Sequence, residues 1–425
     1  MKHRRSKSLL AIPIAAALVL AACGDDDKDA ADTSAAPAET TAAPETTAGG
    51  TETTAAPETT AGGTDTTAGG TDTTAAAGGD VSLADICPST VSIITDWNPE
   101  SEHGFLYQMV GEDYSIDKGA ASVTGSLMAG DVDTGVDIEV RSGGPAIGYQ
   151  TVTSQLYADE DILLGYVYTD EAIQNSADFP TVAIESGFEK NPQMIMWDPE
   201  TYPDVETIEQ LGQTDAIVRY FGGAAYMEYF TGQGILSKDQ VDGSYSGDPS
   251  LFIADEGKAA QQGFGSAEPY LYENVYENWL KPVKYQYIND AGWNNYAESI
   301  ATKPENIEKY ADCFTKLVPI IQQSSVDYLS DPTLANKIII EAVNEFDNGW
   351  VYDEGVADYA VQTIITDGLV ANGPDDTVGN FDMDRVNQLI EIATPIYTEL
   401  GQAPKEGLTA EDIVTNQFID PSISV

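Results

Sequence analysis

Histidine is almost absent from this sequence, with two residues in 425. His3 lies in a leading segment that we expect to be removed, so His103 is the one histidine of the remaining chain. Zinc sites combine several histidine or cysteine ligands at short spacings, and the sequence has neither that spacing nor a Cys-x-x-Cys pair. These absences predict a protein without a metal site and without a cofactor.

The common nucleophile and phosphate-binding motifs are also missing. The stretch GSYSG at 243–247 lacks the central serine of a Gly-x-Ser-x-Gly turn. No glycine-rich loop ending in Gly-Lys-Ser or Gly-Lys-Thr occurs. Carboxylates are so numerous that a glycosidase-like pair stays open, although no pair stands out. The sequence therefore favours a protein that is not an enzyme, and an extracytoplasmic hydrolase is the less favoured alternative.

Basic residues are scarce. Nineteen lysines and arginines stand against 70 aspartates and glutamates, for a formal net charge of −51. A surface this acidic repels phosphate backbones and anionic lipid headgroups. The composition therefore excludes nucleic acid as a partner and leaves a lipid anchor as the one expected link to a membrane.

Long apolar runs are lacking too. The leading run at 9–22 is too short to span a bilayer, follows several basic residues and ends in small ones, which predicts a secretory signal. Leu20-Ala21-Ala22-Cys23 resembles the bacterial lipobox. We therefore expect a signal peptide at 1–22 and lipidation of Cys23, whose acyl chains anchor an extracytoplasmic protein to the cell membrane.

The segment at 23–80 has low complexity and consists almost wholly of Ala, Thr, Gly, Pro, Asp and Glu. It offers little apolar surface to bury, so we expect a disordered linker between the anchor and a folded head. From residue 81 onward the chain is long enough for two lobes. Outside the cell Cys87 and Cys313 meet an oxidising medium, and we favour a disulfide between them over two free thiols.

The globular part alternates short β-branched runs with helical patterns, which predicts an α/β fold with parallel sheets. The predicted strands lie at 91–97, 136–142, 162–168, 215–221 and 283–289. The predicted helices between them lie at 103–110, 145–157, 205–211 and 223–235. The last third is mostly helical, with helix starts expected at Pro304, after Asp331-Pro332, near 353 and after Asp382.

Five stretches together resemble the nitrate, sulfonate, taurine and thiamine-pyrimidine-precursor binding family of ABC importers. They are ITDWNPESEHGFLYQMVG, GVDIEVRSGGPAIGYQ, YPDVETIEQLGQTDAIVRYFGG, GFGSAEPYLYEN and TKPENIEKYADCF. The resemblance implies a two-lobed, type II periplasmic-binding-protein-like fold with a helical C-terminal region. It places lobe 1 at 81–204 and 295–425 and lobe 2 at 205–294, with hinge crossings near 200–205 and 290–300. The segment at 111–134 is longer than expected for the family, and we expect an extra hairpin near the cleft mouth.

In such a fold the ligand lies between the lobes, outside the carboxyl ends of the strands. Glycine-rich turns there let backbone approach a ligand, and cleft arginines, aromatic rings and carboxylates supply its polar and stacking partners. His103 stands at a helix start beside a strand end, where we expect a wall of the site. The candidate ligand-binding residues are Asp96, Trp97, His103, Arg141, Gly143, Gly144, Pro145, Tyr220, Gly222, Gly223 and Glu268.

The resemblance implies a monomeric, lipid-anchored solute-binding protein. It captures a sulfonate-, nitrate- or pyrimidine-precursor-like solute between its lobes and delivers it to ABC permease subunits. Closure of the lobes about the hinge accompanies capture. A surface sensory or adhesion module of the same fold is the alternative from another functional class.

Overall fold

A computed structural model describes residues 81–425, which belong to one compact unit. The signal segment at 1–22, the lipidation site Cys23 and the linker at 23–80 lie outside the described residues, so these three expectations stay predictions. Within 81–425, no helix combines the length and the apolar character that crossing a membrane requires.

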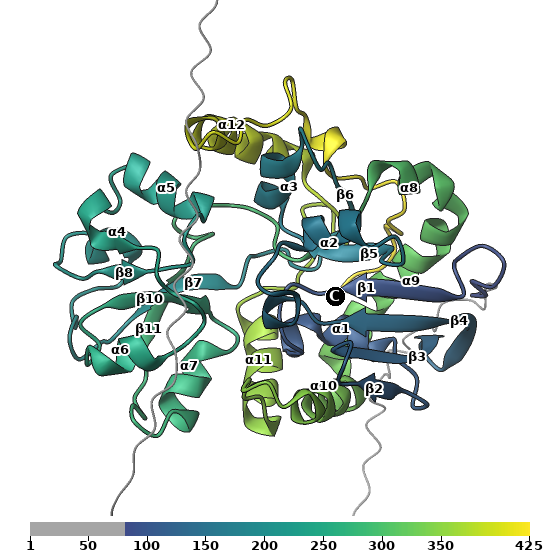
Figure 1. Cartoon of the computed structure of the whole chain (residues 1–425), viewed down its shortest axis with the longest axis horizontal. Helices are drawn as coiled ribbons and strands as arrows, with labels where there is room; N and C mark the ends of the chain where they lie inside the picture. Colours follow the sequence, from purple (N-terminus) through teal and green to yellow (C-terminus); the bar gives the residue numbers. More distant parts are fainter. Residues whose placement is uncertain (1–80) are drawn as a thin grey trace, which may run out of the picture. The chain divides into compact units, whose positions relative to one another are not determined.

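The first sheet defines lobe 1 (Figure 1). Its order is β2 (Ser115–Asp117), β3 (Ser122–Ala129), β4 (Val132–Arg141), β1 (Thr90–Ile94), β5 (Leu164–Val167), β12 (Ser299–Thr302) and β6 (Val182–Glu185). Strands β4, β1 and β5 are parallel, whereas β12 is inserted antiparallel between β5 and β6. A late strand that returns into the first sheet is the hallmark of the predicted type II fold, which is confirmed.

The second sheet defines lobe 2. Its order is β11 (Lys284–Tyr287), β7 (Gln193–Trp197), β10 (Ala260–Phe264), β8 (Val218–Arg219) and β9 (Val241–Asp242). Strand β7 is antiparallel to both of its neighbours, while β8, β9 and β10 are parallel. The expectation of parallel sheets is therefore wrong, because each sheet takes in a strand that enters from the other lobe and the first sheet also carries the antiparallel strands β2 and β3 at its edge.

The chain passes between the lobes twice, at 186–192 and at 288–298. The first crossing differs from the expected one near 200–205, because β7 pairs within the second sheet rather than the first. The two crossing segments lie against each other: a Cβ added at Gly187 would fall 2.6 Å from the Glu298 carbonyl oxygen. Glu298 itself has φ of +49°, a conformation that residues other than glycine rarely adopt.

One arginine binds both crossing segments. Arg385 is 9% exposed, and its guanidinium donates to the carbonyl oxygens of Glu189 (2.8 Å), Asn294 (3.1 Å) and Asn295 (3.0 Å). It also lies 3.7 Å from the centre of the Tyr296 ring. Arg385 belongs to α12 (Met383–Glu399), which contacts helices of both lobes. We call Arg385 and these four partners the hinge clasp.

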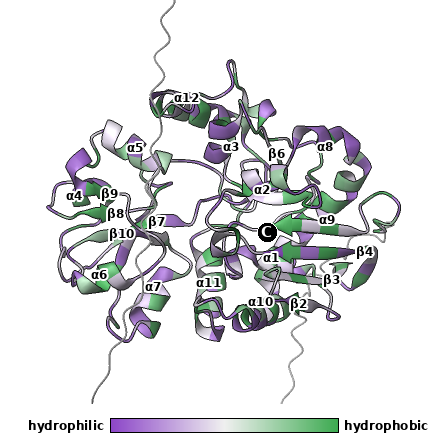
Figure 2. Ribbon diagram, in the orientation of Figure 1, coloured by the Kyte–Doolittle hydropathy of each residue, from purple (hydrophilic) through white to green (hydrophobic). Residues whose placement is uncertain are grey.

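The remaining helices include those that were predicted. Lobe 1 carries α1 (Gly104–Gln108), α2 (Val152–Ala158), α3 (Thr169–Asn175), α8 (Pro304–Lys309), α9 (Ala311–Ser330), α10 (Thr333–Phe346) and α11 (Glu354–Thr366). Lobe 2 carries α4 (Ile208–Leu211), α5 (Ala225–Gly232), α6 (Ser250–Ala254) and α7 (Glu268–Tyr270). Of these, α3, α6 and α7 were not among the predicted helices. Figure 2 shows hydrophobic residues along the strands and mainly hydrophilic ones on α8, as a buried sheet and an exposed helix require.

Local sequence explains several of these boundaries. Pro304 opens α8, and the Asp382 carboxylate accepts hydrogen bonds from the backbone N–H groups of Asp384 and Arg385 at the start of α12. The segment at 111–134 contains the expected hairpin, built from β2 and β3. That hairpin extends the edge of the first sheet, beyond β4.

The disulfide favoured from the sequence is present between Cys87 and Cys313. It joins the segment before β1 to α9 across a separation of 226 residues. Cys313 is fully buried in the core of lobe 1, together with Phe314 and Leu317 of the same helix. The bridge therefore ties the start of the folded chain to its late helical part.

Candidate functional site

The site begins where two parallel strands end side by side. Beyond β1 and β4 the chain stays paired: Thr95 N–H donates to the Arg141 carbonyl (2.8 Å), and Gly143 N–H donates to the Trp97 carbonyl (3.0 Å). This pairing sets Asp96 and Trp97 next to the glycine turn at 143–144. Carboxyl ends of parallel strands are the usual place for a ligand in an α/β fold.

The two glycines are required by close packing. A Cβ at Gly143 would fall 2.2 Å from the Thr95 carbonyl oxygen, and one at Gly144 would fall 2.6 Å from the Trp97 ring. Gly144 also has φ of +51°. Gly247 of lobe 2 approaches the same indole, since its Cβ would lie 3.2 Å from Trp97. Backbone from both lobes thus encloses Trp97.

A cavity of about 490 Å³ lies here between the lobes. This volume suits a small organic molecule. It is lined by Asp96, Trp97, Glu100, Gly144, Tyr149, Gln150, Tyr168, Gln193, Phe221, Tyr245, Ser246, Gly247, Gln262, Gly263, Phe264, Ala267, Glu268 and Trp350.

Aromatic rings dominate one side of the cavity. The Trp97 ring centre lies 6.0 Å from that of Tyr149, 6.1 Å from Phe221 and 6.2 Å from Trp350. Phe221 in turn packs edge-on against Tyr245, with centres 5.1 Å apart. Lobe 1 supplies Trp97 and Tyr149, lobe 2 supplies Phe221 and Tyr245, and the α10–α11 connection supplies Trp350. We call these five rings the aromatic box.

The carboxylates of Asp96, Glu100 and Glu268 also line the cavity. Burial raises the pKa of Glu268 to about 7, against the hydrogen bond that its carboxylate accepts from Phe264 N–H at 2.7 Å. Burial also raises the pKa of Glu100 well above its ordinary value, and the nearby charges of Glu102, Glu298 and Asp96 raise it further. Asp96 accepts a hydrogen bond from the Tyr168 hydroxyl at 3.0 Å.

His103 lies behind this wall rather than in it. The residue is fully buried, and its Nε2 is 3.1 Å from Asp96 Oδ1 and 3.9 Å from Glu100 Oε1. Its Nδ1 and the Glu298 Oε2 have no hydrogen-bond partner. Within 81–425, Asp96, His103 and Glu298 are the group that could hold a metal ion, since one ligand atom from each lies within 4.8 Å of the others. Two of these three possible ligands are carboxylates, whereas the motifs sought in the sequence were those of histidine and cysteine ligands, so the sequence did not predict this group.

Four predicted site residues line the cavity: Asp96, Trp97, Gly144 and Glu268. Gly143 does not line the cavity but packs against the backbone of Thr95 and bonds the Trp97 carbonyl. His103 likewise does not line it but contacts the Asp96 carboxylate. Their roles in ligand binding stay predictions.

The other candidate residues lie outside the cavity, and the contacts of each residue explain its position. Arg141 bonds Glu139 and Asp159, both at 2.8 Å, and Arg219 is held by Asp255 and Asp242. Both arginines therefore neutralise neighbouring carboxylates outside the cavity.

The second-lobe turn also differs from expectation. Tyr220 packs into the core between strand and helix, so strand alternation turns the following Phe221 to the cavity instead. Gly222 and Gly223 are exposed beyond it, and Pro145 is exposed beyond the first-lobe turn. None of these four lines the cavity.

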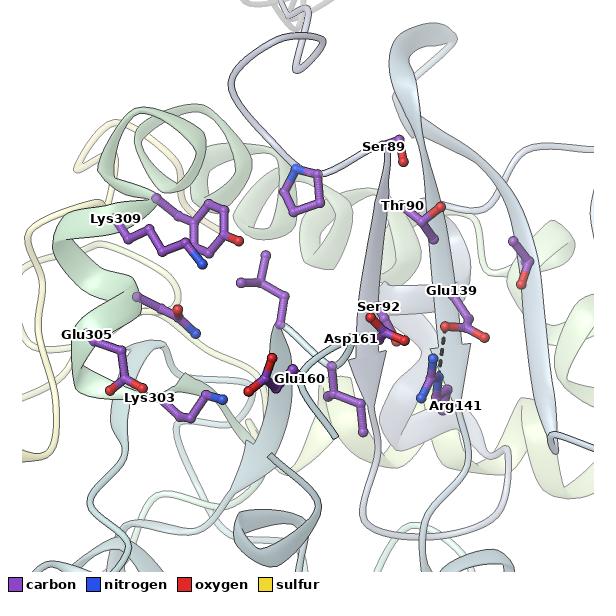
Figure 3. Close-up of a pocket in the computed structure, with 16 residues that line it drawn as sticks. Ser89, Thr90, Ser92, Glu139, Arg141, Glu160, Asp161, Lys303, Glu305 and Lys309 are labelled. Atoms are coloured by element: carbon purple, nitrogen blue, oxygen red, sulfur yellow. Dashed lines mark hydrogen bonds and ion pairs between the residues drawn. The ribbon is translucent and has the colours of Figure 1, made fainter. Parts of the chain in front are cut away.

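Arg141 lines a second, larger cavity of about 750 Å³ (Figure 3). It lies within lobe 1, where β1 and β4 face α8, and contains charged residues of both signs such as Glu139, Lys303 and Lys309. Lobe 2 contributes no residue to it. We therefore take the smaller cavity, to which both lobes contribute, as the candidate site.

Several lining residues had no sequence signal. Trp350 follows a helix in an irregular connection, and Tyr245 belongs to the GSYSG stretch that was considered only as a failed nucleophile motif. Glu100 was one carboxylate among 70 acidic residues. Phe221 had a signal, since it follows Tyr220 at a strand end and alternation lets at most one of these two stacking candidates face the cleft.

No protein-family model matches this chain, and no curated protein matches it. Solved structures do. The aliphatic sulphonate binding protein SsuA from Escherichia coli is similar at 13% identity and a TM-score of 0.49, over 79% of this chain and 92% of that chain. The ligand-binding component of an ABC-type import system from Staphylococcus aureus, solved with zinc bound, is similar at 12% identity and a TM-score of 0.48, over 79% and 99%.

The nitrate-binding protein NrtA from Synechocystis PCC 6803 is similar at 12% identity and a TM-score of 0.38, over 75% of this chain and 91% of that chain. Sulfonate- and nitrate-binding proteins are thus among the structures similar to this chain, in agreement with the resemblance found in its motifs. Identities and TM-scores at this level carry no argument about the function, which rests on the site.

Proposed function

We propose that the protein is an extracytoplasmic, lipid-anchored solute-binding protein of an ABC importer. It captures one small organic molecule between its lobes, without catalysis, and presents it to permease subunits as a monomer. The observation that carries this proposal is the cavity of about 490 Å³, whose walls come from both lobes at the carboxyl ends of β1 and β4.

The connection between the lobes supports a closing motion. Only the segments at 186–192 and 288–298 join the two sheets, and they lie against each other at Gly187 and Glu298. Two adjacent crossings permit a hinge rotation, and a solute that contacts both lobes stabilises the closed arrangement. Ser266 of lobe 2 donates a hydrogen bond to the buried Glu102 of lobe 1, which is one contact that opening would break.

Solute binding is tested on the purified protein with a panel of organic cations, sulfonates, nitrate, pyrimidines, amino acids and sugars. A bound solute is expected to raise the melting temperature by mass action and to reduce the radius of gyration in small-angle scattering. A panel without any thermal or scattering response contradicts the proposal.

The substitution Trp97→Ala is expected to weaken binding of the solute at least about tenfold, because it removes the ring that three other rings of the aromatic box contact. Calorimetric titration measures the loss. Phe179→Ala is the matched control, since that ring is 49% exposed and lies outside both cavities. If the wild type and Trp97→Ala bind the solute with equal affinity, the aromatic box does not take part in binding.

A further inference from the structure

The candidate cavity has an unbalanced charge. Three carboxylates line it, those of Asp96, Glu100 and Glu268, and no lysine, arginine or histidine is among its described lining residues. Behind them lie two more buried carboxylates, Glu102 and Glu298, each 1% exposed. Buried carboxylates need a positive partner or a proton, because removing a lone anion from water costs several kcal/mol.

The protein supplies little of that positive charge. Among the described residues, His103 is the side chain able to carry a positive charge that contacts these carboxylates, at Asp96 and Glu100. Ser266 satisfies one oxygen of Glu102 by a hydrogen bond, whereas Glu102 Oε2 and Glu298 Oε2 have no partner. The carboxylates therefore outnumber the cationic groups beside them, so a cation that enters the cavity can take the place of the protons that burial favours on these groups.

The aromatic box faces the same cavity. Aromatic faces attract cations through the ring quadrupole, most strongly when the rings are shielded from water. Trp97, the best of the aromatic residues for this contact, has three other rings within 6.2 Å of its centre. A metal ion would not use these rings, but an organic cation with apolar groups around its nitrogen would contact both the rings and the carboxylates.

The same geometry disfavours anions. Sulfonate or nitrate binding calls for a positive group that donates hydrogen bonds. Arg141, the candidate arginine of the site, and Arg219 are both engaged by carboxylates outside the cavity. Four carboxyl groups lie near Glu100, those of Glu102, Glu298, Asp96 and Glu268, and in their ionised form they would repel an anion placed beside them.

We propose that the solute is a small organic cation, an alkylammonium or quaternary ammonium compound, held between the aromatic box and the carboxylates of Asp96, Glu100 and Glu268. This inference rests on the proposed function of the cavity as a solute site. It narrows the solute class and excludes the sulfonate and nitrate classes that the sequence resemblance implied.

Binding of a permanent cation is then linked to pH. Glu268 accepts a hydrogen bond from Phe264 N–H, and the titratable groups that face it are Glu100, Glu102, Tyr245, Tyr272 and Tyr276. Glu100 also faces Glu298, Asp96 and His103. With a pKa of about 7, the free Glu268 carboxyl is mostly protonated at pH 6 and mostly ionised at pH 8. A quaternary ammonium ion does not titrate, so its affinity is expected to rise about tenfold between these two pH values.

The experiment is isothermal titration calorimetry of the purified protein with choline, its uncharged isostere 3,3-dimethyl-1-butanol, tetramethylammonium, putrescine, methanesulfonate, nitrate and zinc. At least one organic cation is expected to bind, and choline at least about tenfold more tightly than the neutral isostere. Glu268→Gln keeps an acceptor for Phe264 N–H but removes the charge. It is expected to weaken cation binding about tenfold and to abolish the pH dependence.

Glu308→Gln is the matched control, because this exposed glutamate of α8 is remote from the site and should leave binding unchanged. Binding of methanesulfonate or nitrate without binding of any cation overturns the inference and leaves the proposed function intact. Binding of zinc without binding of any organic cation also overturns the inference. In that case the negative charge of the site serves a metal ion at Asp96, His103 and Glu298. An affinity that is equal for choline and the isostere, or constant from pH 6 to 8, contradicts it. If sugars, amino acids and pyrimidines fail as well, the proposed function itself fails.

Discussion

Replacing Cys87 and Cys313 together by alanine is expected to lower the free energy of unfolding by roughly 2–5 kcal/mol. The bridge closes a loop of 226 residues, and a cross-link of that length removes a large part of the conformational freedom of the unfolded chain. The loss of the buried Cys313 sulfur from the lobe 1 core adds to the effect. Guanidinium unfolding followed by circular dichroism measures the shift in midpoint.

Reduction provides the control for this experiment. Cys87 is partly exposed, so dithiothreitol should reach the bridge and shift the wild-type midpoint toward that of the double variant. The reductant should leave the double variant itself unchanged, because no other bridge exists among residues 81–425. An oxidised wild type that unfolds at the same denaturant concentration as the double variant would show that the bridge does not stabilise the fold.

The second large effect is expected at Glu185, at the end of β6. Glu185→Gln should stabilise the protein strongly at pH 8 and leave it nearly unchanged at pH 4. The wild-type side chain is 1% exposed, its Oε2 has no hydrogen-bond partner, and burial raises its pKa from 4.5 to about 8. This shift corresponds to about 5 kcal/mol between the protonation states.

The direction with pH follows from the raised pKa. The folded chain holds the Glu185 proton more tightly than the unfolded chain, so this contribution to stability is fully present below about pH 4.5. It is lost as the pH rises through about 8. Burial also raises the pKa of Glu171, to about 7, so this group adds to the loss of stability as the pH rises. Thermal unfolding from pH 4 to 8 should therefore show wild-type stability falling more steeply than that of Glu185→Gln.

Glu308→Gln separates this effect from the change in net charge, because it removes the same charge from an exposed position of α8. Its melting curve should follow that of the wild type at each pH. A Glu185→Gln protein that is less stable than the wild type at pH 8 would mean that the buried carboxylate has a stabilising partner in solution.

The fold was predictable in part, because some of its strands carry strong local signals, whereas β6, β7, β9, β10 and β12 were not among the predicted strands. The five predicted strands correspond to β1, β4, β5, β8 and β11. The sequence QMIMW of β7 was missed, since a short buried run without alternation resembles a helix segment as much as a strand. Its omission moved the lobe boundary by about a dozen residues, because membership of a sheet is decided by long-range pairing rather than by local pattern.

The site was predictable only where it lies next to a motif. Asp96, Trp97 and Gly144 follow strand ends that the sequence marks clearly. Trp350 and Tyr149 reach the cavity through connections whose paths depend on the packing of helices, so no local pattern announces them. Arg141 was a candidate ligand contact, and the structure pairs it with Glu139 and Asp159 outside the cavity. A sequence does not reveal which of 70 acidic residues will neutralise a given arginine.

The hinge clasp has a practical consequence. Its guanidinium bonds one carbonyl oxygen on the first crossing segment and two on the second, so sliding one segment past the other would break the hydrogen bonds to at least one of them. A rotation of the lobes that keeps the two segments together can leave these bonds intact. A pair of fluorescent labels, one on each lobe, is therefore expected to report lobe closure, and Arg385 makes this chain a candidate scaffold for a biosensor.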